Sequence, residues 1–229
     1  MSTDCVVVVP MRGRAHMVAG LAESLAASTD RARLLLVTGG ADSRASMLEV
    51  AQAARDADVA WLSMPPRSPV GDYACKINAG YLLSDEPLIF TGAIDLHFTA
   101  GWLEACQEQL AADDRIGVVG TVDGCNPRTA TGDTSTHSLV TRTYANACGT
   151  IDQRGRILHE GYWHEMVDDE LVATARHRGA YAHAFNALVT HRHWSDGGRP
   201  RDHVDADHEL RMVAGRRLFN QRAPLWAAA

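Results

Sequence analysis

Short, continuously apolar runs recur along the first half of the chain. The first, Cys5–Val9, is rich in valine and ends at Pro10. A strand that is buried on both faces of a sheet has this pattern. Similar runs lie at residues 34–37, 59–62, 87–90 and 116–119.

Between these runs, apolar residues recur at helical spacing. The spacing predicts helices around residues 17–25, 43–51, 73–83 and 101–111. Asp42 and Ser43 precede the second of them and can cap its N-terminus. Alternating strands and helices predict a mostly parallel sheet built from right-handed βαβ units and flanked by helices.

The second half of the chain is less regular. Its patterns predict a helix at Leu171–His177, a strand at Ala187–His193 and a final helix at Asp205–Phe219. Residues 121–136 are rich in Thr, Gly, Asp and Asn without periodicity, which predicts a mobile surface loop. We expect residues 1–229 to form a single α/β domain, whose halves meet near residue 120 and share one sheet.

Composition narrows the class of protein. The chain has 229 residues, 46% hydrophobic and 22% charged, so it can form a sizeable core. Its net charge of -6 provides no global basic field for nucleic acid, although a local basic patch remains possible. No apolar run approaches the roughly 20 residues that a membrane span requires.

The cysteines predict a reducing environment. There are five, none in a CxxC pair, which favours neither a zinc site nor a disulfide framework. Together with the absence of a signal-peptide pattern, this usage predicts a cytoplasmic protein.

Ligands of open parallel sheets bind beyond the carboxyl ends of the strands. Pro10 ends the first strand, and Arg12 and Arg14 follow at the start of a predicted helix. Two cations are unfavourable at the positive end of a helix dipole, and a bound anion would remove the conflict. Two solvated loop arginines are an equally good interpretation.

Asp95 follows another predicted strand. The run Leu88–Phe90 leads through Thr91 and Gly92 to this carboxylate at the sheet edge. A carboxylate placed there can bind Mg²⁺ or Mn²⁺, which usually keeps several waters and bridges substrate phosphates. Taken alone, Asp95 could equally be a turn residue or a helix cap.

The segments Val6–Pro10, Lys76–Gly80 and Phe90–Leu103 together resemble the large family of inverting GT-A glycosyltransferases, the family 2-like group. In that family a strand ends in a DxD motif, followed by a helix that begins near a Trp-Leu pair. Aligned on Trp102 and Leu103, the motif falls on Ala93-Ile94-Asp95, so its second aspartate is kept and its first has become alanine. The resemblance implies a Rossmann-like GT-A fold and Mn²⁺ or Mg²⁺ as cofactor.

The same resemblance implies which residues bind the donor, a nucleotide sugar, with a UDP-sugar as the preferred donor. Lys76, the only lysine, falls where the family often places a cation facing the nucleotide, although an exposed helix lysine is an equal alternative. Asp42 is a candidate for contact with the nucleotide base of the donor, or it is only a helix cap. The full set of candidate substrate-binding residues is Pro10, Arg12, Asp42, Lys76, Asn78, Ile94, Asp169 and Trp194.

The resemblance extends to residues 137–194 and implies a general base there. Family members carry it near the start of a late helix, and matching Glu170 and Leu171 places it on Asp168. Asp169 and Glu165 are the alternatives, and all of these acids could simply favour the helix dipole.

Histidines complete the expected metal site. His191 and His193 share one face of a strand, and His191 best matches the place where several GT-A enzymes position a metal or diphosphate ligand. We therefore expect Asp95 and His191 to bind the metal, while His97 and His193 remain further possibilities.

These patterns lead to one preferred function and several alternatives. We expect residues 1–120 to bind the donor and residues 121–229 to bind an acceptor hydroxyl, with inversion at the anomeric carbon. The acceptor could be a hydroxymethylated pyrimidine in phage DNA, contacted by 121–136 and by Arg192, Trp194, Arg199 and Arg201, or a polysaccharide or small metabolite. A nucleotidyltransferase and a sugar-binding module without activity are the competing classes.

Overall fold

A computed structural model describes residues 3–227, and every structural statement below refers to them. One sheet has the strand order β3-β2-β1-β4-β7-β6-β8-β5. Neighbours among β1 to β4 are parallel, as are β6 and β8, whereas β7 is antiparallel to β4 and β6, and β5 to β8. The strands are β1 (Cys5–Pro10), β2 (Ala32–Gly39), β3 (Ala60–Met64), β4 (Leu88–Thr91), β5 (Leu96–Phe98), β6 (Val118–Val122), β7 (Ser138–Thr141) and β8 (Tyr181–His191).

Alternation along β1 creates two hydrophobic cores, one on each face of the sheet. Val7 and Val9 join a cluster with α1 (Val18–Ser28), α2 (Arg44–Asp56) and α4 (Trp102–Ala112). Val6 and Val8 join another cluster with α3 (Asp72–Leu82), α6 (Arg142–Ala147) and α7 (Val167–His177). Because successive side chains of a strand point to opposite faces, one apolar run supplies both cores.

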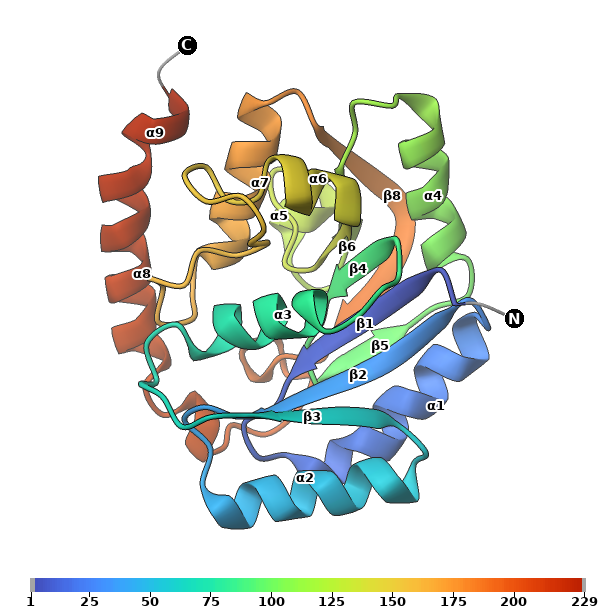
Figure 1. The fold of residues 1–229 in the computed structure, drawn as a ribbon, viewed down its shortest axis with the longest axis vertical. Coiled ribbons are helices and arrows are strands. Elements are labelled where there is room, and N and C mark those ends of the chain that lie inside the picture. The colour runs from blue at the N-terminus through green and yellow to red at the C-terminus, as the bar shows by residue number, and fades with distance from the viewer. Residues whose placement is uncertain (1–2, 228–229) are drawn as a thin grey trace.

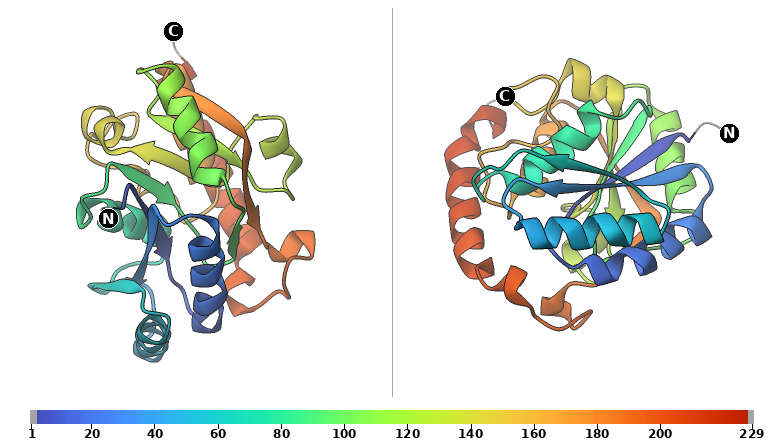
Figure 2. Two further views of the ribbon diagram at one scale, coloured as in Figure 1. Left: turned by 90° about the vertical axis from the view of Figure 1, so that its right-hand side faces the viewer. Right: turned by 60° about the horizontal axis from the view of Figure 1, so that its bottom comes forward.

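The last long helix stands beside the sheet. In Figures 1 and 2, α8 (His208–Arg222) lies along one side of the molecule, with the short α9 (Pro224–Ala227) after it. Arg222 ties α8 to α7 through two hydrogen bonds to the Glu170 carboxylate, at 2.8 and 2.9 Å. The segment between β8 and α8 crosses the carboxyl end of β1, where Arg14 contacts it.

The structure confirms the predicted α/β class and the mostly parallel, helix-flanked sheet. The predicted strand at 187–193 is the end of a longer β8, and the final helix begins at His208 rather than at residue 205. Short elements β5, β7 and α6 were not predicted, because three to six residues carry too little periodicity.

The prediction of a plain surface loop at 121–136 was wrong. Its first residues belong to β6, α5 (Pro127–Ala130) follows, and Thr129, Thr134 and Ser135 are buried. Side-chain hydroxyls satisfy the buried backbone here, as when the Ser135 hydroxyl accepts from the Thr121 N–H at 2.9 Å. Polar composition alone could not distinguish such a segment from an exposed one.

Among the described residues, no helix combines the length and apolar character needed to cross a bilayer.

Candidate functional site

A pocket lies beyond the carboxyl ends of β1 and β4, where an open parallel sheet is expected to bind ligands. Its walls come from the segments after these strands, Pro69 and the start of α3, the two residues before β7, the segment around Trp163 and Asp168, the end of β8, and the stretch from Arg199 to Arg211. The pocket therefore joins both halves of the chain.

Asp95 lies on the pocket wall and is 4% exposed. Its Oδ1 lies 3.2 Å from His191 Nε2, and its Oδ2 accepts from Arg199 Nε at 3.0 Å, with Arg14 Nη1 at 3.8 Å. Burial opposes ionisation of Asp95, but the hydrogen bonds from His191 and Arg199 and the charge of Arg14 hold its pKa well below the ordinary value. Asp95 is therefore an anion at any physiological pH.

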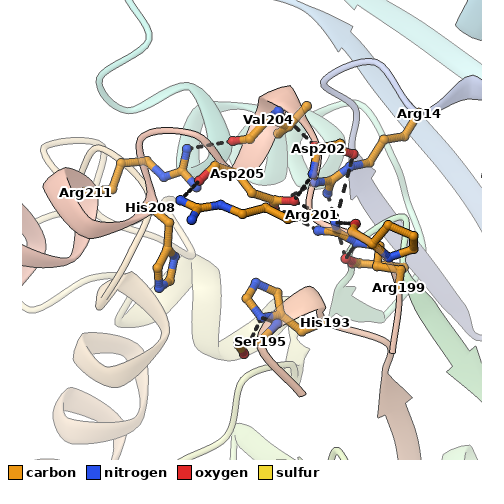
Figure 3. Close-up of polar contacts among 12 residues, drawn as sticks. Arg14, His193, Ser195, Arg199, Arg201, Asp202, Val204, Asp205, His208 and Arg211 are labelled. Atoms are coloured by element: carbon orange, nitrogen blue, oxygen red, sulfur yellow. Dashed lines mark hydrogen bonds and ion pairs between the residues drawn. The ribbon is translucent and has the colours of Figure 1, made fainter. Parts of the chain in front are cut away.

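Two carboxylates, those of Asp202 and Asp205, fix the side chains of Arg14 and Arg199 (Figure 3). Arg14 donates to both oxygens of Asp202, at 2.8 and 2.9 Å, and to Asp205 Oδ1 at 2.8 Å. Arg199 donates to both oxygens of Asp205, at 2.7 and 2.9 Å. Bidentate pairing holds guanidinium planes in one orientation, so these cations are pre-positioned around Asp95.

Arg14 also has a left-handed backbone, with φ of 57°. Such a conformation is costly for a residue with a Cβ and occurs most often at functional sites. Met166, between Glu165 and the start of α7, also has a left-handed backbone, with φ of 72°.

The three acidic candidates for a base differ in their surroundings. Asp168 and Glu165 line the pocket, whereas Asp169 pairs with Arg128 at 2.8 Å and accepts from the Thr134 hydroxyl. Burial, and then the charges of Asp169 and Glu165, raise the pKa of Asp168 well above its ordinary value. Burial also opposes ionisation of Glu165, but the charges of His164, His208 and Arg211 lower its pKa overall.

His137 and His193 also line the pocket. His137, 4% exposed, lies with Nδ1 2.7 Å from the Thr91 carbonyl, and its ring meets that of His191 edge to face at 5.0 Å. Burial, with the charge of His191 second, lowers the pKa of His137 to about 3. Burial likewise lowers the pKa of His193, whose Nδ1 is 2.7 Å from the Ser195 hydroxyl. Both rings are neutral at physiological pH.

The structure brings some of the predicted binding residues to the pocket and not others. Pro10, Arg12 and Ile94 line it, and Arg12 has no ion-pair partner in the described part of the chain. Lys76 is fully buried behind the wall, where Nζ lies 3.1 Å from Asp42 and 2.7 Å from Asp72. Neither Lys76 nor Asp42 lines the pocket, whereas Asp72 does.

Asn78 holds a loop rather than lining the pocket. Its amide donates to the Leu158 carbonyl and to Glu160, both at 2.9 Å, and its Oδ1 accepts from the backbone N–H groups of Ile157 and Leu158. A fully used amide of this kind fixes the segment before α7.

Trp194 and its neighbours form a surface beside the pocket. The Arg201 guanidinium lies over the Trp194 ring at 4.6 Å and also pairs with Glu209, while Arg192 is exposed. His97 lies on β5 opposite Thr190 and does not line the pocket.

Sequence reasoning did not single out several residues of the site. The sequence predicts Arg199 only as a DNA contact and indicates no role in the site for Asp202, Asp205, His137 or Trp163. The one local signal was the capping box, in which Asp202 and Asp205 exchange side-chain and backbone hydrogen bonds.

The residues around Asp95 fit a divalent cation only if water or substrate oxygens complete its coordination. One carboxylate and one imidazole suit Mn²⁺ in chemical character, and both line the pocket. Within residues 3–227, no group of three His, Cys, Asp or Glu side chains could hold a metal. The remaining positions would be filled by water or phosphate oxygens, which is the common mode for Mg²⁺.

Comparisons with known proteins support the fold. No protein-family model matches the chain, and no curated protein sequence matches it either. Among solved structures, it is similar to the mannosyltransferase PcManGT from Pyrobaculum calidifontis in complex with GDP-Man and Mn²⁺. That match has a TM-score of 0.60 and 13% identity, and it covers 100% of this chain and 76% of the other.

A second similar structure is glucosyl-3-phosphoglycerate synthase from Mycobacterium tuberculosis in complex with Mn²⁺, UDP-glucose and phosphoglyceric acid. Its TM-score is 0.61 at 13% identity, with 94% of this chain and 79% of that chain covered. Identity this low shows a shared fold and no more. The chain has the GT-A fold of these glycosyltransferases, as the sequence predicted.

Proposed function

We propose that the chain is a glycosyltransferase that moves a sugar from a nucleoside-diphosphate sugar to an acceptor hydroxyl, with inversion at the anomeric carbon. The observation that carries this proposal is the contrast between two carboxylates in one pocket. Asp95 has a strongly lowered pKa and Asp168 a strongly raised one. Opposite shifts in one pocket are typical of a permanent anion beside an acid–base group.

Asp95 and His191 would hold Mn²⁺ or Mg²⁺ together with the donor diphosphate. Both similar structures described above contain Mn²⁺ with a nucleotide sugar, and the synthase has also been solved with Mg²⁺ and UDP. When bound, the ion would offset negative charge on the departing nucleoside diphosphate. Arg12, with no ion pair of its own, lies on the same wall and can bind a phosphate.

Asp168 would remove the proton from the acceptor hydroxyl as that oxygen attacks the anomeric carbon. A raised pKa makes a carboxylate a stronger base, and general base catalysis typically contributes about 10²–10⁴-fold. Glu165 lines the same pocket but is already paired with His208 and Arg211, at 3.2 and 3.4 Å, which makes it the second choice. A displacement from the opposite face of the sugar would invert its configuration.

For the acceptor, a modified pyrimidine in DNA, a polysaccharide and a small metabolite all provide hydroxyl groups. Arg199 and Arg201, expected to contact DNA, already pair with carboxylates of the protein, and the net charge is -6. These pairs favour a small acceptor. Retention on DNA that falls steeply with salt would instead favour the nucleic acid.

A thermal-shift screen with UDP-glucose and GDP-mannose, with and without Mn²⁺, tests the proposal. We expect stabilisation by one donor that requires Mn²⁺ and is lost in Asp95→Asn and His191→Ala. His97→Ala is the matched control, because His97 lies outside the pocket and its replacement should leave stabilisation by the donor unchanged. Lys76→Met would not serve as a control, because Lys76 is fully buried and its loss would destabilise the fold. Stabilisation by neither donor under either condition would refute the proposal, and binding without transfer or hydrolysis would identify a binding module.

A further inference from the structure

His137 carries a hydrogen-bonding atom that the protein does not use. The side chain lines the pocket and is 4% exposed, and its Nδ1 lies 2.7 Å from the Thr91 carbonyl oxygen. The opposite nitrogen, Nε2, is buried and has no hydrogen-bond partner among residues 3–227. An unpaired buried polar atom costs free energy, so its presence on a pocket wall calls for an explanation.

The partner of Nδ1 defines what Nε2 can bind. A carbonyl oxygen only accepts, so Nδ1 must carry the proton of the imidazole. No carboxylate forms an ion pair with His137 within the described chain, and an unpaired imidazolium would be costly at such a buried position. Nε2 is therefore a lone-pair acceptor.

Packing holds this acceptor in one place. The rings of His137 and His191 meet edge to face at 5.0 Å, and Phe90 lies on another side at 6.3 Å between centroids. His191 in turn contacts Asp95, so the His137 ring stands next to the end of the pocket where the donor would bind.

Trp163 independently provides an unpaired donor, where His137 provides an unpaired acceptor. It also lines the pocket, and its indole Nε1, which can only donate, is buried without a hydrogen-bond partner in the described residues. The pocket thus has both an unused acceptor and an unused donor. Phosphate oxygens could satisfy only the donor, whereas hydroxyl groups can satisfy both.

We propose that His137 and Trp163 bind hydroxyl groups of the transferred sugar, with His137 Nε2 accepting a hydrogen bond and Trp163 Nε1 donating one. This inference rests on the proposed function, since it presumes a sugar in the pocket. It assigns recognition of the sugar to these two residues and recognition of the diphosphate to the charged groups around Asp95.

The experiment compares the binding of UDP-glucose and GDP-mannose with that of UDP and GDP, by calorimetry in Mn²⁺. The key variant is His137→Asn, because its amide nitrogen can still donate to the Thr91 carbonyl while no atom replaces Nε2. We expect the affinity for the nucleotide sugar to fall about 2- to 10-fold, the effect of one hydrogen bond, and the affinity for the diphosphate to stay constant. Trp163→Phe should give the same pattern.

His137→Gln tests the assignment from the other direction, since its amide oxygen can approach the position of Nε2 and should recover part of the affinity. His97→Asn makes the same chemical change outside the pocket and should alter neither affinity. Melting temperatures identify any variant that fails to fold, in which case Trp163→Phe and His137→Gln decide the question.

Two negative results have different meanings. If the wild-type protein binds neither nucleotide sugar, the proposed function fails. If it binds one and both His137→Asn and Trp163→Phe bind it equally well, the proposed function stands and this inference is overturned. A fall in Mn²⁺ affinity without loss of discrimination between nucleotide sugar and nucleoside diphosphate would also overturn it, because His137 would then act on the metal.

Discussion

Arg199 Nε lies 3.0 Å from Asp95 Oδ2, although 104 residues separate the two in the chain. Both side chains are nearly buried, at 9% and 4% exposure, and Asp205 pairs with the same guanidinium. A cation from the segment before α8 therefore balances a carboxylate at the end of the β-sheet.

Replacing Arg199 should consequently lower the free energy of unfolding substantially. Arg199→Ala leaves the carboxylates of Asp95 and Asp205 buried with less compensating charge, and breaking a buried pair typically costs about 3–5 kcal/mol. Urea unfolding measures the loss. Arg201→Ala, which breaks the exposed pair with Glu209, should cost less than about 1 kcal/mol, and equal losses would contradict this ranking.

Asp168→Asn should reduce transfer while stabilising the protein. Loss of the base lowers kcat by about 10²–10⁴-fold. Because the folded-state pKa of Asp168 lies above its unfolded value, its ionisation opposes folding as the pH rises through the folded pKa. The variant should melt above the wild type at neutral pH, and the difference should disappear in acid.

Glu165→Gln tests whether Glu165, rather than Asp168, is the general base. Its carboxylate pairs with His208 and Arg211, so we expect lower stability and a smaller loss of kcat. If Glu165→Gln abolishes transfer while Asp168→Asn retains it, Glu165 is the base.

The pH dependence of activity should report Asp168. As pH falls through its raised pKa, Asp168 takes up a proton and kcat/KM declines, whereas Asp95 remains ionised throughout. The charge of Asp169 helps to raise this pKa, so Asp169→Asn should move the acid limb to lower pH. Rate profiles from pH 4 to pH 9 of both proteins check this, and an unmoved limb would contradict the assignment.

The contact between α8 and α7 should be a determinant of stability. Glu170 is 3% exposed and receives two hydrogen bonds from Arg222 and one from the Tyr162 hydroxyl. Arg222→Ala should cost about 3–5 kcal/mol in the free energy of unfolding. Arg217→Ala, an exposed arginine on the same helix, should cost almost nothing, and denaturant titration of both variants makes the comparison.

Much of the fold could be predicted from the sequence because its central strands are buried on both faces. The valines of β1 supply both cores, which produces a continuous apolar run that is easy to recognise. β7 has only four residues and runs antiparallel between β4 and β6, and nothing in Ser138–Thr141 indicates that direction. Direction is set by partners distant in sequence.

The candidate site could be predicted only in part, for a similar reason. Asp95 Oδ1 and His191 Nε2 lie 3.2 Å apart because strand ends converge at one sheet edge, while their role as metal ligands stays a prediction. Nothing in the sequence around Lys76 indicates that it pairs with Asp42 and Asp72. Likewise, nothing around Arg199 indicates that its side chain reaches Asp95. Such pairings depend on tertiary packing, which local patterns do not encode.

The bonds from Arg14 to Asp202 and Asp205 join residues 188 and 191 positions apart. During synthesis the sheet strands up to β8 leave the ribosome before either carboxylate does, so a growing chain can form its core while the pocket still lacks one wall. Donor binding should therefore appear late in translation, after residue 205 has emerged. A nascent chain with residues only up to His191 outside the ribosome should be unable to retain the nucleotide sugar.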